Sequence, residues 1–335
     1  MAPRARKRSL PLSRIARIGT VIVVVAAAVL CSILLAGCAP AAQPAQGGTQ
    51  AAAPADAQFP FTFIDDMGRQ VTLPAPPVRL VSLSPGNTEI LFALGLGPKV
   101  VGVDEYSDYP PEAAQVAKIG SFSQPSVEKV VALKPDLVLA TDMHEQAVRQ
   151  LEDLGIPVAV VLPRTVDQVM RSIAWVGRAA GVKDKADQLA AEMQARIAKV
   201  KTRVENIPQE ERPRVYYEVY SDPLMSAGPK TFIGQLIVLA GGRNIAQDAD
   251  TDYPKFSAEA IIKRNPQVMI FPQFHGTAAL TVEQIKARRG WAQVSAVKDS
   301  RLYGIDADLI SRPGPRVAEA LEELARLIHP ELFTK

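Results

Sequence analysis

Short apolar runs alternate with amphipathic segments along most of the chain after residue 59. The apolar runs are bounded by Gly, Pro, Asn, Asp or Ser, and they predict buried strands at 78–83, 100–103, 137–140 and 158–162. Segments with helical spacing lie between them, at 88–94, 126–133 and 145–154. Because strands that alternate with helices form parallel sheets covered by helices, this part of the chain predicts an α/β lobe.

A long helical stretch follows this first lobe. Residues 166–180 and 183–204 are rich in Ala, Leu, Glu and Lys, and we expect Gly181 between them only to bend one rod. The alternation then restarts, with elements predicted at 214–219, 232–240, 258–264, 268–271, 301–305 and 316–328. The sequence therefore predicts two α/β lobes, each with a mostly parallel sheet and flanking helices, at 59–164 and 206–335, joined by a long connecting helix at 165–205.

The first 38 residues differ in kind from the rest of the chain. A head with six basic residues is followed by an uncharged stretch, residues 18–35, which ends in Leu35-Ala36-Gly37-Cys38. This order predicts an export signal, and the tetrapeptide resembles the lipobox of bacterial lipoproteins, so Cys38 is expected to carry lipid. The alternative is an uncleaved membrane helix, since about 18 apolar residues approach the minimum span. Either way, the remainder is expected outside the cytoplasm, anchored to a membrane.

Removal of the signal at 1–38 changes the charge and cysteine arguments. The signal has six basic and no acidic residues, so the formal net charge falls from +3 to about −3. No nucleic-acid surface is implied, and Cys31 and Cys38 leave no disulfide for the mature domain. Residues 39–58 are rich in Ala, Pro, Gln and Gly, and they predict a flexible tether.

One short sequence pattern occurs once in each predicted lobe. Ser126 and Glu128 recur 131 residues later (259 − 128) as Ser257 and Glu259, each pair before a Pro and an apolar run. A Ser at the N-cap and a Glu in the first turn are typical of an ordinary helix start. Two copies at equivalent places in two lobes also indicate a paired role for the carboxylates.

The chain resembles the substrate-binding proteins of ABC importers for cobalamin, iron-siderophores and haem. The likeness covers residues 60–335, and it is carried by DDMGR (65–69), RLVSLSPGNTEI (79–90), VGVDEYSDYPP (101–111), GGRN (241–244) and GW (290–291). The resemblance implies a binding protein that captures a ligand between two lobes and delivers it to a permease. Within the family the chain is most similar to the cobalamin-binding members.

The resemblance also implies how the protein meets its permease. Glu128 and Glu259 match the positions at which one Glu of each lobe docks into arginines of the permease. Carboxylate–guanidinium pairs are directional, but exposed pairs contribute only about 0–1 kcal/mol. We therefore expect them to fix the orientation of the protein on the permease more than the affinity between the two. We expect a monomer that docks on a permease dimer and binds no nucleic acid.

By the same likeness, the ligand lies in the interlobe cleft against loops at the strand ends. Tyr106 and Phe122 are expected to contact a corrin from one side, Met225 and Tyr253 from the other, and Asp308 to accept a hydrogen bond. The full expected ligand-binding set is Tyr106, Phe122, Met225, Tyr253, Phe274, Asp308 and Arg312. The aromatic members suit a broad, flat, largely apolar ligand, although Phe122 and Tyr253 stand where the best-matched relatives have Trp.

Two other ligands remain open at this point. An anionic ferric siderophore would need Arg or Lys in the cleft, and Lys230 and Arg312 are the candidates, although residues 312–316 also read as a plain turn before the last helix. Haem would need an axial ligand, and His144 and His275 follow equivalent predicted strands. No resident cofactor and no metal site are expected in any of these cases.

A different class, an extracytoplasmic metal-dependent enzyme, is a remote alternative. The chain contains no Gly-x-Ser-x-Gly elbow, no phosphate-binding Gly-Lys-Ser/Thr loop and no His-Glu-x-x-His motif. Asp142-Met143-His144-Glu145 could supply some of the ligands of a metal ion, but the whole chain has only three His, which are few for a zinc-type site. The sequence therefore favours a binding protein over an enzyme.

Overall fold

The computed structural model describes residues 59–273 and 280–333. The predicted signal, the tether and Cys38 lie outside the described residues, as do Phe274 and His275. Within the described ranges, no helix combines the length and the apolar character needed to cross a membrane.

The first lobe is built on a four-stranded parallel sheet in the order β4-β3-β5-β6. Its strands are β3 (Leu80–Ser82), β4 (Val100–Val103), β5 (Leu137–Ala140) and β6 (Val158–Val160). Every residue of β5 is buried, as expected for a central parallel strand covered on both faces. Its helices are α1 (Pro85–Ala93), α2 (Val127–Ala132) and α3 (Glu145–Asp153), with 3₁₀ turns at Gly97–Lys99, Pro111–Gln115 and Asp142–His144.

An antiparallel hairpin that the sequence analysis did not predict precedes this sheet. It consists of β1 (Phe61–Ile64) and β2 (Gln70–Leu73). Phe61 and Phe63 stack on each other, and Phe63 stacks on Trp175 with ring centroids 4.8 Å apart. The hairpin thus packs on the helical layer, and its apolar face covers part of the core.

The second lobe has a five-stranded sheet in the order β11-β10-β7-β8, with β9 paired to β7. Only β8 runs antiparallel to its neighbour. The strands are β7 (Arg214–Ser221), β8 (Leu224–Ser226), β9 (Arg243–Asn244), β10 (Val268–Gln273) and β11 (Leu302–Asp306). The helices are α6 (Phe232–Leu239), α7 (Ala258–Arg264), α8 (Val282–Lys286), α9 (Ser295–Lys298), α10 (Ala307–Ser311) and α11 (Val317–Ile328), with 3₁₀ turns at Trp291–Gln293 and Pro330–Leu332.

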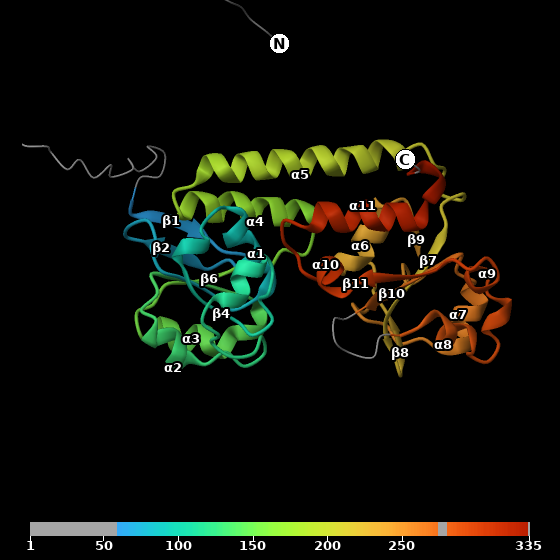
Figure 1. Ribbon diagram of the computed structural model, residues 1–335, viewed down its shortest axis with the longest axis horizontal. Helices are drawn as coiled ribbons and strands as arrows, with labels where there is room; N and C mark the ends of the chain where they lie inside the picture. Colours follow the sequence, from blue (N-terminus) through green and yellow to red (C-terminus); the bar gives the residue numbers. More distant parts are fainter. Residues whose placement is uncertain (1–58, 274–279, 334–335) are drawn as a thin grey trace, which may run out of the picture. The chain divides into compact units, whose positions relative to one another are not determined.

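The connecting stretch corrects the expectation of one bent rod, because it forms two helices that lie side by side (Figure 1). These are α4 (Val166–Ala179) and α5 (Lys183–Val204). Gly181 has φ of 72°, the left-handed conformation that ends a helix, so the chain turns back on itself instead of bending. The helices approach so closely that a Cβ on Gly177 would lie 2.3 Å from the Cβ of Ala186.

Helix α5 spans from one lobe to the other. A Cβ built on Gly95 of the first lobe would lie 2.6 Å from Nζ of Lys185, near the start of α5. One built on Gly241 of the second lobe would lie 2.8 Å from the Cβ of Val204, its last residue. The largest apolar cluster includes side chains of both sheets and of α4, α5 and α11. The lobes therefore share one core, and smaller clusters fill the other side of each sheet.

Candidate ligand-binding site

The loop after β4 holds Tyr106 on a rigid base. Asp104 is fully buried, and its carboxylate accepts hydrogen bonds from the Tyr106 N–H at 3.0 Å and from the Ser107 hydroxyl. Lys118 Nζ donates to the carbonyls of Asp104 and Ser107, at 3.3 and 2.6 Å. Burial raises the pKa of Asp104, and the hydrogen bonds of its carboxylate act against that rise. This buried network fixes the loop while the Tyr106 side chain remains 60% exposed.

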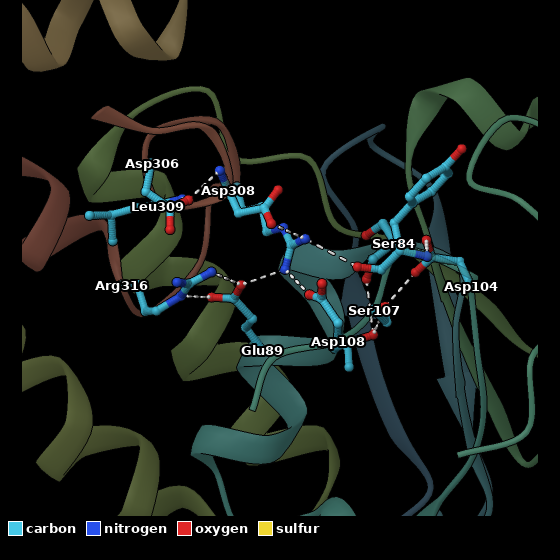
Figure 2. A network of polar contacts seen from close by, with 12 residues as sticks. Ser84, Glu89, Asp104, Ser107, Asp108, Asp306, Asp308, Leu309 and Arg316 are labelled. Atoms are coloured by element: carbon cyan, nitrogen blue, oxygen red, sulfur yellow. Dashed lines mark hydrogen bonds and ion pairs between the residues drawn. The ribbon is translucent and has the colours of Figure 1, made fainter. Parts of the chain in front are cut away.

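A buried carboxylate on α1, Glu89, binds two arginines that precede α11. Figure 2 shows the Glu89 carboxylate and the Arg316 guanidinium facing each other. Arg316 donates two hydrogen bonds, Nη2 to Oε1 at 2.6 Å and Nε to Oε2 at 2.9 Å, the bidentate geometry of an ion pair. Burial raises the pKa of Glu89, whereas Arg316 and Arg312 act to lower it. The guanidinium of Arg316 also lies 3.9 Å from the ring centre of Tyr109.

Arg312 lies at the centre of this interlobe network. Its Nη1 approaches Asp108 at 2.8 Å and Glu89 at 3.4 Å, and its Nη2 approaches Asp308 at 2.8 Å and the Tyr106 carbonyl at 3.1 Å. Burial acts to lower the pKa of Arg312, but the hydrogen bond that it donates to Asp108 and the charges of the nearby carboxylates outweigh burial and raise the pKa. Arg312 thus joins the lobes, and three carboxylates neutralise it.

The described structure brings three members of the expected ligand-binding set, Tyr106, Asp308 and Arg312, together. The segment of Arg312 also forms a turn before the last helix, because the Gly314 N–H donates to the Arg312 carbonyl at 2.8 Å. Lys230, the other candidate cation, is exposed and forms no ion pair with any described residue.

Met225 and Tyr253 form a second group, in the other lobe. Met225 on β8 pairs with Lys255, and the neighbouring Ser226 N–H donates to the Pro254 carbonyl at 3.1 Å. This backbone pairing places the segment of Tyr253 beside β8 and leaves the Tyr253 side chain 51% exposed. Among the described residues, no hydrogen bond or ring contact joins Tyr253 to Tyr106.

The ring of Phe122 packs against the ring of His144. Their rings meet edge to face with centroids 5.1 Å apart. The loop of Phe122 is linked to that of Tyr106, because the Glu105 N–H donates to the Gly120 carbonyl at 2.9 Å. Phe122 is half-buried.

His144 is a buried structural residue, which corrects the expectation that it could face the cleft as an axial ligand. Its side chain is 2% exposed. Nδ1 accepts the Thr141 N–H at 3.0 Å, so Nε2 carries the proton and donates to the Phe122 carbonyl at 2.6 Å. Both ring nitrogens are therefore occupied. Burial lowers the pKa of His144, which favours the neutral ring. Among the described residues, no group of three or more His, Cys, Asp and Glu side chains is arranged to hold a metal.

The repeated pattern forms the same local structure in both lobes. The Ser126 hydroxyl accepts the Lys129 N–H at 3.3 Å, and the Ser257 hydroxyl accepts the Ala260 N–H at 3.1 Å, so both serines are N-caps. Glu128 and Glu259 lie in the first turns of α2 and α7, are exposed, and form no ion pair within the described ranges. Hydrogen bonds from its own N–H and from Ser257 lower the pKa of Glu259.

The sequence analysis missed Glu89, although it quoted the stretch that contains it. The available signal was a single carboxylate in the otherwise uncharged segment 84–94, together with Arg312 and Arg316 one helical turn apart. No local pattern connects them, since 223 and 227 residues separate them from Glu89.

Comparisons with known proteins agree with this architecture. The family profile described as "Periplasmic binding protein" matches residues 80–309. The chain is 37% identical over 314 residues to the ABC transporter substrate-binding lipoprotein YvrC of Bacillus subtilis, a match that covers 92% of this chain and 97% of YvrC. It is 30% identical over 267 residues to the vitamin B12-binding protein of Vibrio cholerae, with 78% of this chain and 93% of that protein covered.

A solved structure shows the same fold. The periplasmic haem-binding protein RhuT from Roseiflexus sp. RS-1, in its apo form, matches with a TM-score of 0.67 and 28% sequence identity. The match covers 76% of this chain and 98% of RhuT. Proteins similar to this chain thus include binders of vitamin B12 and of haem.

Proposed function

Because the chain belongs to the periplasmic binding protein family and is an extracytoplasmic substrate-binding protein of an ABC transporter, not an enzyme, we propose that its ligand is a corrinoid of the cobalamin type. The ligand is captured at the loops that carry Tyr106 and Tyr253 and is delivered to the permease. The observation that carries the choice of ligand is the neutralised state of Arg312.

An anionic ligand would need a cation that is free to meet it. Carboxylates of a ferric siderophore or the propionates of haem favour an unneutralised Arg or Lys. Arg312 already has Asp108, Asp308 and Glu89 around it, so three carboxylates face the two guanidinium groups of Arg312 and Arg316. A corrinoid has an amide-rich periphery, which needs hydrogen-bonding groups such as Asp308 and no excess of positive charge.

The exposed aromatic side chains support a broad, flat ligand. Tyr106 and Tyr253 belong to different lobes, and both keep about half or more of their side-chain surface exposed. Aromatic rings offer large apolar contact area and lose little conformational freedom on binding. Met225 beside Tyr253 adds a soft, adaptable surface. The buried Asp104 network holds Tyr106 in place beforehand, which lowers the entropic cost of binding.

Calorimetric titration of the purified protein with cyanocobalamin, haemin and a ferric siderophore tests this proposal. We expect one-to-one binding of cyanocobalamin, weakened by Tyr106→Ala and by Tyr253→Ala but not by Leu154→Ala, an exposed apolar residue at the end of α3. Preferential binding of haemin or of the siderophore would overturn the corrinoid assignment and leave the binding-protein class intact.

We also propose that Cys38 carries the lipid anchor. Its support is the tetrapeptide that ends at Cys38 and the likeness to a protein named as a lipoprotein. Metabolic labelling with a fatty acid should mark the wild-type protein and not Cys38→Ser. Equal labelling of both would contradict the assignment.

A further inference from the structure

Two arginines lie side by side at the amino edge of the second sheet, away from the ligand loops. Arg214 begins β7 and Arg243 begins β9, and the two are register partners in parallel strands. Partners in a parallel pair lie on the same face of a sheet, with backbones about 4.8 Å apart. The fold therefore brings two positive charges together. Tyr106 and Asp308, by contrast, follow the carboxyl ends of their strands.

Neither arginine has a carboxylate partner among the described residues. Arg214 donates its Nε to the carbonyls of Arg264 and Asn265, at 3.1 and 2.9 Å, and so caps the end of α7. Arg243 donates its Nε to the Arg212 carbonyl at 3.0 Å. Burial and the positive charge of Arg243 lower the pKa of Arg214, as expected when like charges are not neutralised.

Both arginines line a cavity of about 380 Å³. Arg264 lines it too, but Asp248 binds Arg264 through two hydrogen bonds of 2.6 and 3.0 Å and neutralises it. Gln209 and Gln247 add amide groups to the lining. A water molecule takes up about 30 Å³ of liquid, so the cavity has room for a small ion and several waters.

We infer that this cavity binds a small oxyanion of the phosphate class through the forked guanidinium groups of Arg214 and Arg243. Arginine matches the geometry of phosphate oxygens because its planar fork donates two parallel hydrogen bonds. The bound anion would neutralise two charges for which the described part of the chain supplies no carboxylate. The site is distinct from the proposed corrinoid site and does not depend on it.

Titration of the detergent-purified full-length protein with inorganic phosphate tests the inference. Calorimetry at constant ionic strength should show saturable binding that sodium chloride does not reproduce. Arg243→Gln should weaken phosphate binding about tenfold or more, because hydrogen bonds to a charged group are lost. Arg243→Lys, which keeps the charge but not the fork, should weaken binding by less. Arg289→Gln, an exposed arginine of the same lobe, is the matched control and should change nothing.

A parallel titration with a soluble short-chain phosphatidic acid separates the two sources of a phosphate group. Binding of inorganic phosphate that depends on Arg243 supports a site for the free ion. Binding of the phosphatidic acid alone, with the same dependence, supports a site for a lipid headgroup. Absence of saturable binding of both to the wild-type protein overturns the inference, as does equal binding by the wild type and both Arg243 variants.

Discussion

Two pairs of arginines in this protein lie in contrasting surroundings. Arg312 and Arg316 lie between the lobes with three carboxylates within 3.4 Å of their guanidinium groups. Arg214 and Arg243 lie on the second sheet, and no carboxylate among the described residues pairs with them. A guanidinium group alone therefore does not predict an anion site. The carboxylates around it determine whether it joins parts of the protein or is available to a ligand.

Glu89→Ala should have the largest effect, because it leaves Arg316 without its carboxylate partner, as in the other pair, whereas Arg312 keeps Asp108 and Asp308. Glu89 is nearly completely buried, and removal of one partner from a buried ion pair costs about 3–5 kcal/mol of the free energy of unfolding. Denaturant unfolding measures the loss. Glu323→Ala removes a carboxylate paired with Arg326 at the surface and should cost about 0–1 kcal/mol. Equal losses in the two variants would contradict the role assigned to Glu89.

Asp308→Asn should have a smaller effect on stability and a clearer one on ligand choice. Its side chain is about one-third exposed, so solvent screening limits the loss to about 1 kcal/mol. The substitution removes one counter-charge from Arg312, so haemin should bind better relative to cyanocobalamin. Competitive calorimetry measures this ratio, with Asp153→Asn on α3 as an exposed control. An unchanged ratio would show that the charge of Arg312 does not select the ligand.

His144 differs from both arginine pairs, because burial keeps its side chain neutral. Burial lowers its pKa in the folded state below the ordinary value of 6.5, so the unfolded chain binds its proton more readily. Its contribution to stability is complete above pH 6.5 and is lost as the pH falls towards the folded-state pKa. As the pH is lowered from about 8 to about 5, the free energy of unfolding of His144→Gln should fall less steeply than that of the wild type. The same pH dependence of the unfolding free energy in the wild type and in His144→Gln would contradict this prediction.

Asp248→Asn should add a third unneutralised arginine to the phosphate cavity, because it removes the carboxylate that pairs with Arg264. The Arg264–Asp248 pair is exposed, and such pairs are worth up to about 1 kcal/mol, so phosphate should bind tighter by about fivefold or less. Calorimetric titration with phosphate measures the change. Weaker binding by this variant would count against the cavity as the place where phosphate binds.

The docking carboxylates should give the smallest effect on stability. Glu128 and Glu259 are exposed, so Glu128→Ala with Glu259→Ala should leave both the stability and the ligand affinity unchanged. Transport should nevertheless fall, since we propose that these two side chains orient the protein on the permease. Uptake by cells that carry the double variant provides the measurement. Lost ligand affinity, or normal uptake, would rule out the docking role.

Elements with strong local signals could be predicted from the sequence. Apolar runs such as 137–140 became buried parallel strands, and both Ser-x-Glu patterns became capped helix starts, since each depends on neighbouring residues only. The hairpin β1–β2 was missed because it is stabilised by stacking on Trp175, which is more than 100 residues away. The reversal at Gly181 was taken for a bend because composition does not report the sign of φ.

The candidate site was predicted less completely than the fold. Tyr106, Met225 and Tyr253 were expected to bind the ligand through a resemblance, and the structure shows the backbone contacts that hold the loops of Tyr106 and Tyr253. Arg312 was considered as an anion ligand because two of its carboxylate partners, Glu89 and Asp108, are more than 200 residues away in sequence. His144 was considered as an axial ligand because burial of a single histidine depends on tertiary packing. In both cases the surroundings of the side chain include contacts with other segments of the chain.

The core that the lobes share determines how the protein responds to force. Side chains of both sheets pack into one cluster with α4, α5 and α11, so a shared core holds the lobes together. If a permease pulls on α2 in one lobe and α7 in the other, the load passes through this cluster and through the ion pairs of Glu89. The protein would then behave as a stiff spring, and release of the ligand would require mechanical work from the transporter.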